Sequence, residues 1–150
     1  MAIVTQLQIV DRIRNLGNSH KMINDVRYGF LTDVDDMPVF DPPVLYIVPQ
    51  TVSVPRDGIW RFSFSLVCFD KLEADKSNFD YLVSDCTGYL MDIYSELLYN
   101  DGTSVESWAI QPGTQIVPFQ ERFKDYCAGA TMTIAIDIFQ ENCRNPLPFA

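Results

Sequence analysis

The feature that most constrains the fold of this 150-residue chain is a period-two pattern in residues 59–69. Large apolar side chains occupy alternate positions: Trp60, Phe62, Phe64, Leu66 and Cys68. Because successive side chains of a strand point to opposite faces, the pattern predicts a strand with one face in the core. We interpret Trp60, Phe62 and Phe64 as core residues and not as a base-stacking platform, since Arg61 is the only basic residue among them.

A second pattern, with the period of a helix, covers residues 79–97. Its apolar stripe consists of Phe79, Leu82, Val83, Cys86, Leu90, Ile93 and Leu97. Ser77 is the expected N-cap, and the helix should end near Tyr99. Gly88 lies inside this helix at a cost of about 1 kcal/mol relative to alanine. We therefore expect Gly88 to mark close packing against another element.

Weaker patterns complete the set of expected elements. The spacing of Ile3, Leu7, Val10 and Ile13 predicts an N-terminal helix that stops at Gly17 and Asn18. Short strands are expected at 26–30, at 44–48 with a weak extension to 54, at 105–110 and at 114–117, where Pro118 should end the strand. A strong alternating strand is expected at 131–139, and residues 56–58 should form the turn before the 59–69 strand.

These elements together predict the fold class. Strands that follow one another through short turns should pair antiparallel, and helices should cover one face of the resulting sheet. We therefore expect an α+β fold, with an antiparallel sheet of about four or five strands covered on one face by two helices, as a two-layer sandwich. The length favours a single structural domain over residues 1–150, with 139–150 as an extended C-terminal tail.

Charge and cysteine content argue against several classes of function. The formal net charge is −9, and the eleven basic residues are scattered, which is unlike a phosphate-binding surface. The four cysteines form no CxxC pair, so free thiols in a reducing compartment are expected, with no metal site. Apolar runs are much shorter than the roughly 18 residues that suggest a membrane span, so no membrane partner is expected.

The sequence offers little catalytic chemistry. His20 is the only histidine, and we interpret it as a solvated or capping residue. The acidic residues Asp33, Asp35 and Asp36 lack the glycine and glutamate of an EF-hand loop, so a solvated loop is expected. No nucleophile motif or Gly-rich phosphate loop is present. We expect no catalytic residue, cofactor or metal, and no enzyme; His20 bonded to a carboxylate in a deep pocket would favour the opposite.

Residues 117–129 carry a resemblance to a known family. They read Val-Pro-Phe-Gln-Glu-Arg-Phe-Lys-Asp-Tyr-Cys-Ala-Gly, which resembles the Pro-Phe-x-Glu-Arg-Phe-x-Asp-x-x-Ala-Gly signature of tail-completion or neck proteins of tailed bacteriophages, including phages that infect Bacteroidetes. The order of the expected elements is similar over nearly the whole chain. The chain departs from this family in its longer C-terminal tail.

The resemblance implies a virion structural protein, similar to tail terminators, that forms a ring at the head–tail connector or tail end. It implies a homo-oligomer of six or twelve subunits, other neck and tail proteins as partners, and assembly in the host cytoplasm. DNA would pass through the lumen without specific binding, and an acidic lumen would let it slide. The alternative from another class is a small non-enzymatic binding or adaptor domain that acts through its sheet face or edge.

The candidate assembly or loop-anchoring residues all lie in the segment that carries the resemblance: Phe119, Glu121, Arg122, Phe123, Asp125 and Tyr126. Glu121 and Arg122 should either fix this loop by ion pairs or backbone contacts, or form a solvated pair. Phe119 and Phe123 are expected to anchor the loop on the domain and not to touch a neighbour. Aromatic residues outside the expected core offer further interface surface: Phe30, Phe40, Phe119, Phe123, Tyr126 and Phe149.

Overall fold

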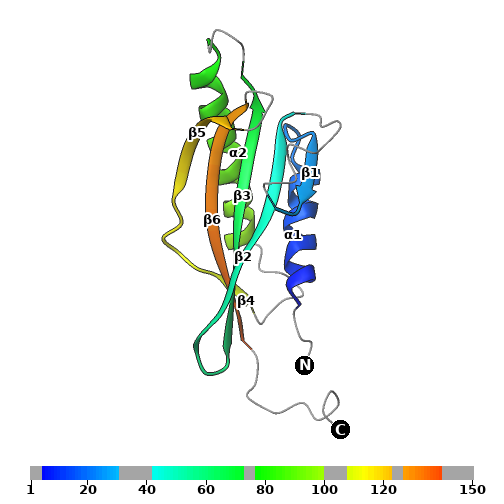
Figure 1. The fold of residues 1–150 in the computed structure, drawn as a ribbon. Helices are drawn as coiled ribbons and strands as arrows, with labels where there is room; N and C mark the ends of the chain where they lie inside the picture. Colours follow the sequence, from blue (N-terminus) through cyan, green and yellow to red (C-terminus); the bar gives the residue numbers. More distant parts are fainter. Residues whose placement is uncertain (1–4, 31–41, 73–76, 100–107, 123–126, 140–150) are drawn as a thin grey trace.

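The computed structural model describes residues 5–30, 42–72, 77–99, 108–122 and 127–139. Its elements are α1 (Gln6–Ser19), β1 (Asp25–Tyr28), β2 (Val44–Arg56), β3 (Ile59–Lys71), α2 (Phe79–Tyr99), β4 (Trp108–Ile110), β5 (Ile116–Arg122) and β6 (Cys127–Phe139). The six strands form one sheet, and both helices lie on the same face of it (Figure 1). The predicted α+β class and the two covering helices are therefore confirmed.

The sheet differs from the prediction in being mixed. Its strand order is β1-β2-β3-β6-β4, with β5 also paired to β6. Strand β1 runs parallel to β2, whereas the other pairs are antiparallel. The expectation of a purely antiparallel sheet was wrong because residues 29–43 separate β1 from β2. A connection of that length exceeds a hairpin turn and can return the chain to the starting end of the sheet.

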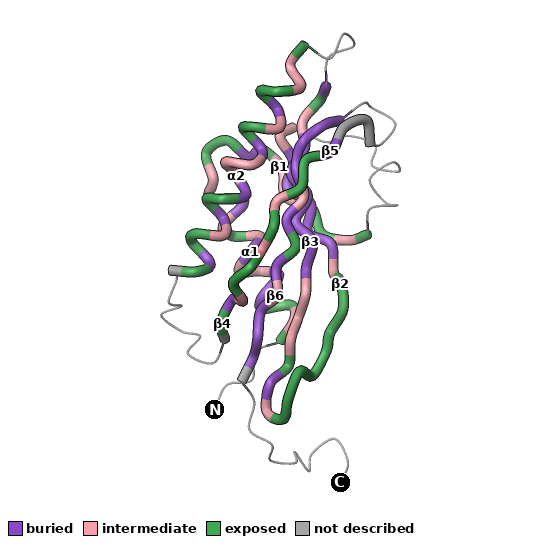
Figure 2. The backbone as a smooth tube through the Cα atoms, turned by 90° about the vertical axis from the view of Figure 1, so that its left-hand side faces the viewer, coloured by how far each residue is buried: buried purple, intermediate pink, exposed green. Residues whose placement is uncertain are grey.

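The sheet is also curled and packs on both faces, so it is not a flat layer of a two-layer sandwich (Figure 2). The main core lies between the sheet and the helices and includes Leu45, Phe64, Leu66, Leu90 and Ile134, all fully buried. A second buried cluster lies on the opposite face: Val44, Tyr46, Val48, Val67, Phe69, Phe119 and Cys127. This explains why 44–48 and 66–69 are continuously apolar, since both faces of these segments are buried.

Strand lengths follow the sequence pattern at some ends and not at others. β2 and β3 form the predicted hairpin, with Arg56 paired to Ile59 around a turn in which Gly58 has a φ of 80°. β6 begins at Cys127, four positions before the predicted start. Pro118 does not end β5, which continues to Arg122. β5 is an edge strand, and an edge tolerates a residue without an N–H.

Helix α1 has a different C-terminal boundary from the one predicted. It begins with a capping box between Thr5 and Gln8 and ends at Ser19. Gly17 is not the stop but a buried helical residue where a Cβ atom would lie 2.8 Å from Val26 Cγ2 and 2.9 Å from Leu45 Cδ2. The glycine thus lets the helix approach β1 and β2 closely.

Helix α2 matches its predicted stripe. Leu82, Cys86, Leu90, Ile93 and Leu97 are buried, and the helix ends at Tyr99 as expected. It begins at Phe79, so Asn78 and not Ser77 precedes the first helical residue. The prediction for Gly88 was wrong within this subunit. A Cβ atom at Gly88 would meet nothing within 4 Å, because the glycine faces away from the sheet.

Candidate assembly interface

The segment that carries the family resemblance is an edge hairpin of the sheet. β5 pairs antiparallel with the first half of β6, from Ile116 opposite Met132 to Arg122 opposite Cys127. Glu121 and Arg122 belong to β5, and their side chains lie outside the described part of the structure. Phe123, Asp125 and Tyr126 also lie outside the described residues, as do Phe40 and Phe149. The predicted ion pair therefore stays a prediction.

Phe119, which was predicted to anchor the loop on the domain, packs inside the subunit. It lies on β5 and is only 8% exposed within the second buried cluster. Its cross-strand partner is Gly129, whose partner on the other side is Phe69. Two buried phenylalanines therefore flank a glycine across three strands and cover the position that lacks a side chain. The aromatic and the glycine of the motif serve the fold at this point.

Gly129 allows the closest backbone approach in this region. A Cβ atom there would overlap the carbonyl oxygen of Cys68 and lie 2.9 Å from the Cα atom of Phe69. The sheet is drawn together where β3, β6 and β5 meet. We interpret residues 117–122 and 127–129 primarily as the closure of this sheet edge, where Val117 is an apolar side chain exposed to solvent.

His20 is hydrogen-bonded to a carboxylate, an arrangement that would favour a catalytic role. However, both of its ring nitrogens already have a partner within the protein. Nε2 lies 2.9 Å from Oδ2 of Asp92, and Nδ1 accepts the backbone N–H of Met22 at 3.2 Å. Because Nδ1 is an acceptor, Nε2 carries the proton and donates to Asp92. The ring also packs edge-on against Tyr89. An acid–base histidine needs a nitrogen that faces its substrate, so this geometry describes a link between α1 and α2.

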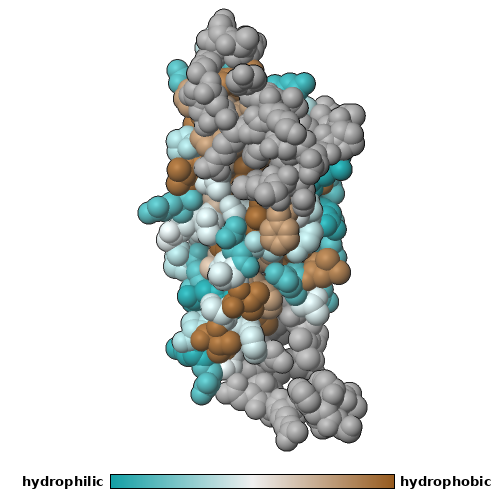
Figure 3. Space-filling view, in the orientation of Figure 1, coloured by the Kyte–Doolittle hydropathy of each residue, from teal (hydrophilic) through white to brown (hydrophobic). Residues whose placement is uncertain are grey.

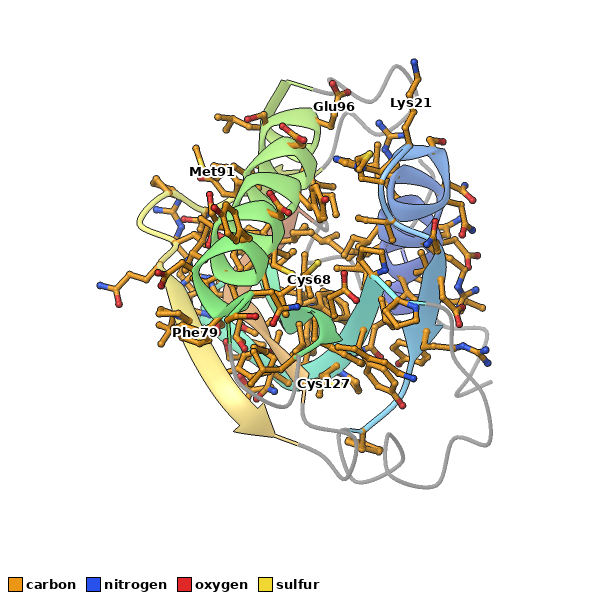
Figure 4. All side chains as sticks on the ribbon, turned by 90° about the horizontal axis from the view of Figure 1, so that it is seen from above. Lys21, Cys68, Phe79, Met91, Glu96 and Cys127 are labelled. Atoms are coloured by element: carbon orange, nitrogen blue, oxygen red, sulfur yellow. The ribbon has the colours of Figure 1, made fainter. Side chains whose placement is uncertain are left out.

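A cleft of about 450 Å³ lies beside this link, between the end of α1 and the second half of α2. Its walls are Leu16, Ser19, His20, Asp92, Ile93, Ser95 and Glu96. It is open, since the Asp92 side chain is 66% exposed. Figure 4 shows Glu96 on the side of α2 that faces α1, with Lys21 near the end of α1. As predicted, His20 caps α1: its backbone N–H bonds the carbonyls of Leu16 and Gly17.

Arg61 and Asp137 form a cross-strand pair on the sheet face away from the helices. Arg61 Nε and a terminal nitrogen contact the two carboxylate oxygens at 2.7 and 3.0 Å. The Asp137 side chain is 6% exposed, and Arg61 about a third exposed. The hydrogen bonds to Asp137 raise the pKa of Arg61. This bidentate pair satisfies a buried carboxylate, so we assign it to the fold and not to a binding site.

Asp70, near the end of β3, is partly buried, and its surroundings in the folded protein disfavour the ionised carboxylate. Burial, and more weakly the negative charge of Asp85, raise its pKa, while its bond from the Lys71 N–H acts against this. A carboxyl whose folded pKa is raised destabilises the fold when ionised. That cost vanishes as the pH falls through the raised pKa and is absent below 3.8, the ordinary value for aspartate.

We therefore expect Asp70→Asn to be more stable than the wild type at about pH 7, by less than about 1 kcal/mol because the group is half exposed. The difference should vanish at about pH 3, where the aspartate is neutral in both states. Urea unfolding of both proteins at the two pH values measures it. A variant that is less stable at pH 7 would show that the carboxylate is needed for the Lys71 contact.

The β2–β3 hairpin carries several exposed apolar side chains. We call residues 49–62 the arm; Figure 1 shows that it extends past the ends of both helices. Val52, Val54 and Trp60 are 46%, 50% and 43% exposed. The core assignment is therefore confirmed for Phe64 and for the partly buried Phe62 but was wrong for Trp60. Apolar surface over the hairpin is visible in Figure 3.

The outer edge of the arm carries no strand among the described residues. β1 covers only Val44 to Ile47 of β2, and residues 50–57 are exposed. Pro49 and Pro55 bracket this edge, and register irregularities occur near both. Prolines and bulges are devices that limit uncontrolled pairing at an exposed edge. The arm is thus a protected edge with half-exposed apolar side chains.

Helix α2 presents a second unpartnered surface, which we call the outer face of α2. Tyr81, Met91 and Leu98 are 73%, 56% and 50% exposed. Their spacings of ten and seven residues, roughly three and two helical turns, bring them to one side of the helix with Gly88 between them. The charged residues of α2 are Asp80, Asp85, Asp92 and Glu96, with no lysine or arginine. Sequence reasoning missed this surface because its apolar residues are widely spaced.

The described residues contain no group of three or more side chains suited to hold a metal ion. Within the same residues, no helix combines the length and the apolar character that crossing a membrane requires. The described cysteines, Cys68, Cys86 and Cys127, are buried. A hydrogen bond with Cys86, together with burial, raises the pKa of Cys68 well above that of an ordinary thiol, which keeps the thiol protonated and unreactive.

No protein-family model matches the chain, and no curated protein matches it.

Proposed function

We propose that this protein is a virion structural subunit that assembles into a closed ring at the head–tail connection of a tailed bacteriophage. The observation that carries the proposal is the arm, which holds Val52, Val54 and Trp60 about half exposed beyond the helices. Scattered exposed apolar residues are ordinary on a protein surface, but a projecting hairpin that groups them is typical of an interaction site. The resemblance of residues 117–129 to neck proteins supplies the place of action.

The charge supports a role around DNA without binding to it. The net charge is −9, and all charged residues of α2 are acidic. An acidic lumen would repel phosphates and let the genome pass. The ring is the active unit in this proposal, so the subunit needs no catalytic group. The hydrogen bonds that occupy both ring nitrogens of His20 are consistent with a subunit that has no catalytic histidine.

The test is the assembly state of the intact chain and its presence in the particle. Native mass spectrometry from micromolar to millimolar protein should show one closed oligomer, with six or twelve subunits as the expected numbers. Mass spectrometry of purified virions should detect the chain, and a particle reconstruction should place it in the neck. A chain that remains monomeric at all concentrations and is absent from purified virions would refute the proposal.

The second candidate is a small adaptor domain that adds a partner strand to the free edge of β2. Residues 50–54 favour it, because no described strand pairs with their outer edge and an extended peptide can pair with such an edge. The two candidates differ in stoichiometry. An adaptor stays monomeric and binds one peptide per chain, whereas the ring subunit associates with copies of itself.

A further inference from the structure

The sheet face that the helices cover continues along the arm, where no helix of the described residues lies on it. Phe62 packs against the main core, and Trp60 lies two positions further along the same face of β3. Val52 is the cross-strand partner of Phe62 and so lies on this face too. A sheet face of this kind is normally covered by a helix or by another sheet. A helix with an apolar outer surface could therefore cover this face of the arm.

The outer face of α2 has the properties that such a helix needs. Tyr81, Met91 and Leu98 are exposed along it, and Gly88 leaves open space where another element could approach the helix backbone. Figure 4 shows Met91 on the flank of α2 that points away from α1. Within one subunit this face cannot reach the arm, because α2 already buries its other side on β3 and β6. A second copy of the chain can supply it.

Size and charge favour the same pairing. The eight-residue outer strand of the arm spans about 26 Å and α2 about 31 Å, so one can lie along most of the other. All charged residues of α2 are acidic, which disfavours contact between two copies of this helix. The arm carries two guanidinium groups, Arg56 and Arg61, against one carboxylate, Asp57. Arg61 is bonded to Asp137, so Arg56 is the cation it offers a partner.

We propose that the arm of one copy docks on the outer face of α2 of the next copy, with Val52, Val54 and Trp60 against Tyr81, Met91 and Leu98. The two surfaces differ, so the contact is heterologous and repeats from copy to copy until the assembly closes. This inference rests on the proposed function, which requires self-assembly, and specifies the two surfaces that produce it. In this contact, Gly88 would let the arm of the next copy approach the backbone of α2, a role that it does not have in the isolated subunit.

Charge exchange between the two surfaces tests the inference. The arm variant V52E/V54E places carboxylates against an acidic helix, and the α2 variant Y81R/M91R places guanidinium groups against Arg56. Each variant alone should lose assembly, with the apparent dissociation constant raised by at least about 30-fold. An equimolar mixture should assemble again, because the altered arm fits the altered helix and the two unaltered surfaces fit each other. The restored oligomer should contain the variants in strict alternation.

Leu7→Glu is the matched control, since Leu7 is 60% exposed and lies outside both surfaces. It should assemble like the wild type. Circular dichroism and thermal unfolding of every variant identify any that fail to fold, and the single changes Val54→Glu and Met91→Arg then replace the doubles. Native mass spectrometry, with one variant isotopically labelled, reads size and composition.

The outcomes separate the inference from the function. If the wild type assembles and both double variants assemble equally well, the interface lies elsewhere: the inference fails and the proposed ring survives. If both variants fail alone and also as a mixture, the two surfaces do not contact each other, and the inference fails again. A wild type that is monomeric at every concentration removes the proposed function together with the inference.

Discussion

Gly129→Ala is expected to cost at least about 3 kcal/mol of folding free energy, the largest loss among the single substitutions considered for this protein. The added Cβ would overlap the carbonyl oxygen of Cys68 and lie 2.9 Å from backbone atoms of both Cys68 and Phe69. These are backbone atoms of a central strand, so no side-chain rotation relieves the contact. Urea unfolding with a circular dichroism readout measures the loss.

Gly88→Ala is the control, and we expect it to change the folding free energy in the opposite direction. Nothing lies within 4 Å of a Cβ at that position, so the substitution should stabilise the monomer by about 1 kcal/mol through helix propensity. If Gly129→Ala instead unfolds at the wild-type denaturant concentration, the close approach of β3 and β6 at this point is wrong. Both measurements should be made at protein concentrations below assembly, so that Gly88 reports the subunit alone.

Phe119→Ala is expected to cost about 3 kcal/mol, in the range for truncation of a buried phenylalanine. Phe119 is 8% exposed in the second buried cluster and flanks Gly129 across the β5–β6 ladder. Its loss should weaken the whole edge that carries the family motif. Thermal and urea unfolding of the monomer measure the effect.

Val117→Ala is the matched control, two residues earlier on the same strand face but 56% exposed, and it should change stability by less than about 0.5 kcal/mol. The pair also decides between the two roles considered for Phe119. A Phe119→Ala variant that keeps its stability and loses assembly would show that this side chain contacts a neighbouring subunit and does not anchor the edge.

Predictions that depended on local periodicity agree with the structure. The alternation in 59–69 and 131–138 and the stripe from Leu82 to Leu97 identified β3, β6 and α2, since each burial pattern repeats within one element. The turn at Gly58 was likewise encoded in adjacent residues. The parallel pairing of β1 with β2 was missed, because no pattern inside two strands shows their relative direction.

The sequence likewise indicated some residues of the candidate interface and not others. Phe119 was expected to be an anchor because it lies in the segment that carries the resemblance, and it is buried within the subunit. The arm and the outer face of α2 were missed. Val52 and Trp60 have the same residue types and spacing as core positions, and nothing in the sequence distinguishes the exposed end of a strand from its covered end.

The period-two strand at 59–69, with its apolar face, was determined by the sequence alone, because backbone pleating imposes that period wherever the strand lies. Only the tertiary structure decided which part of that face would be covered. β3 has 13 residues and extends about 43 Å, whereas α2 has 21 residues and extends about 31 Å. The strand therefore extends beyond the helix that packs on it. Trp60 is left exposed at the uncovered end, where we place the contact with a second subunit.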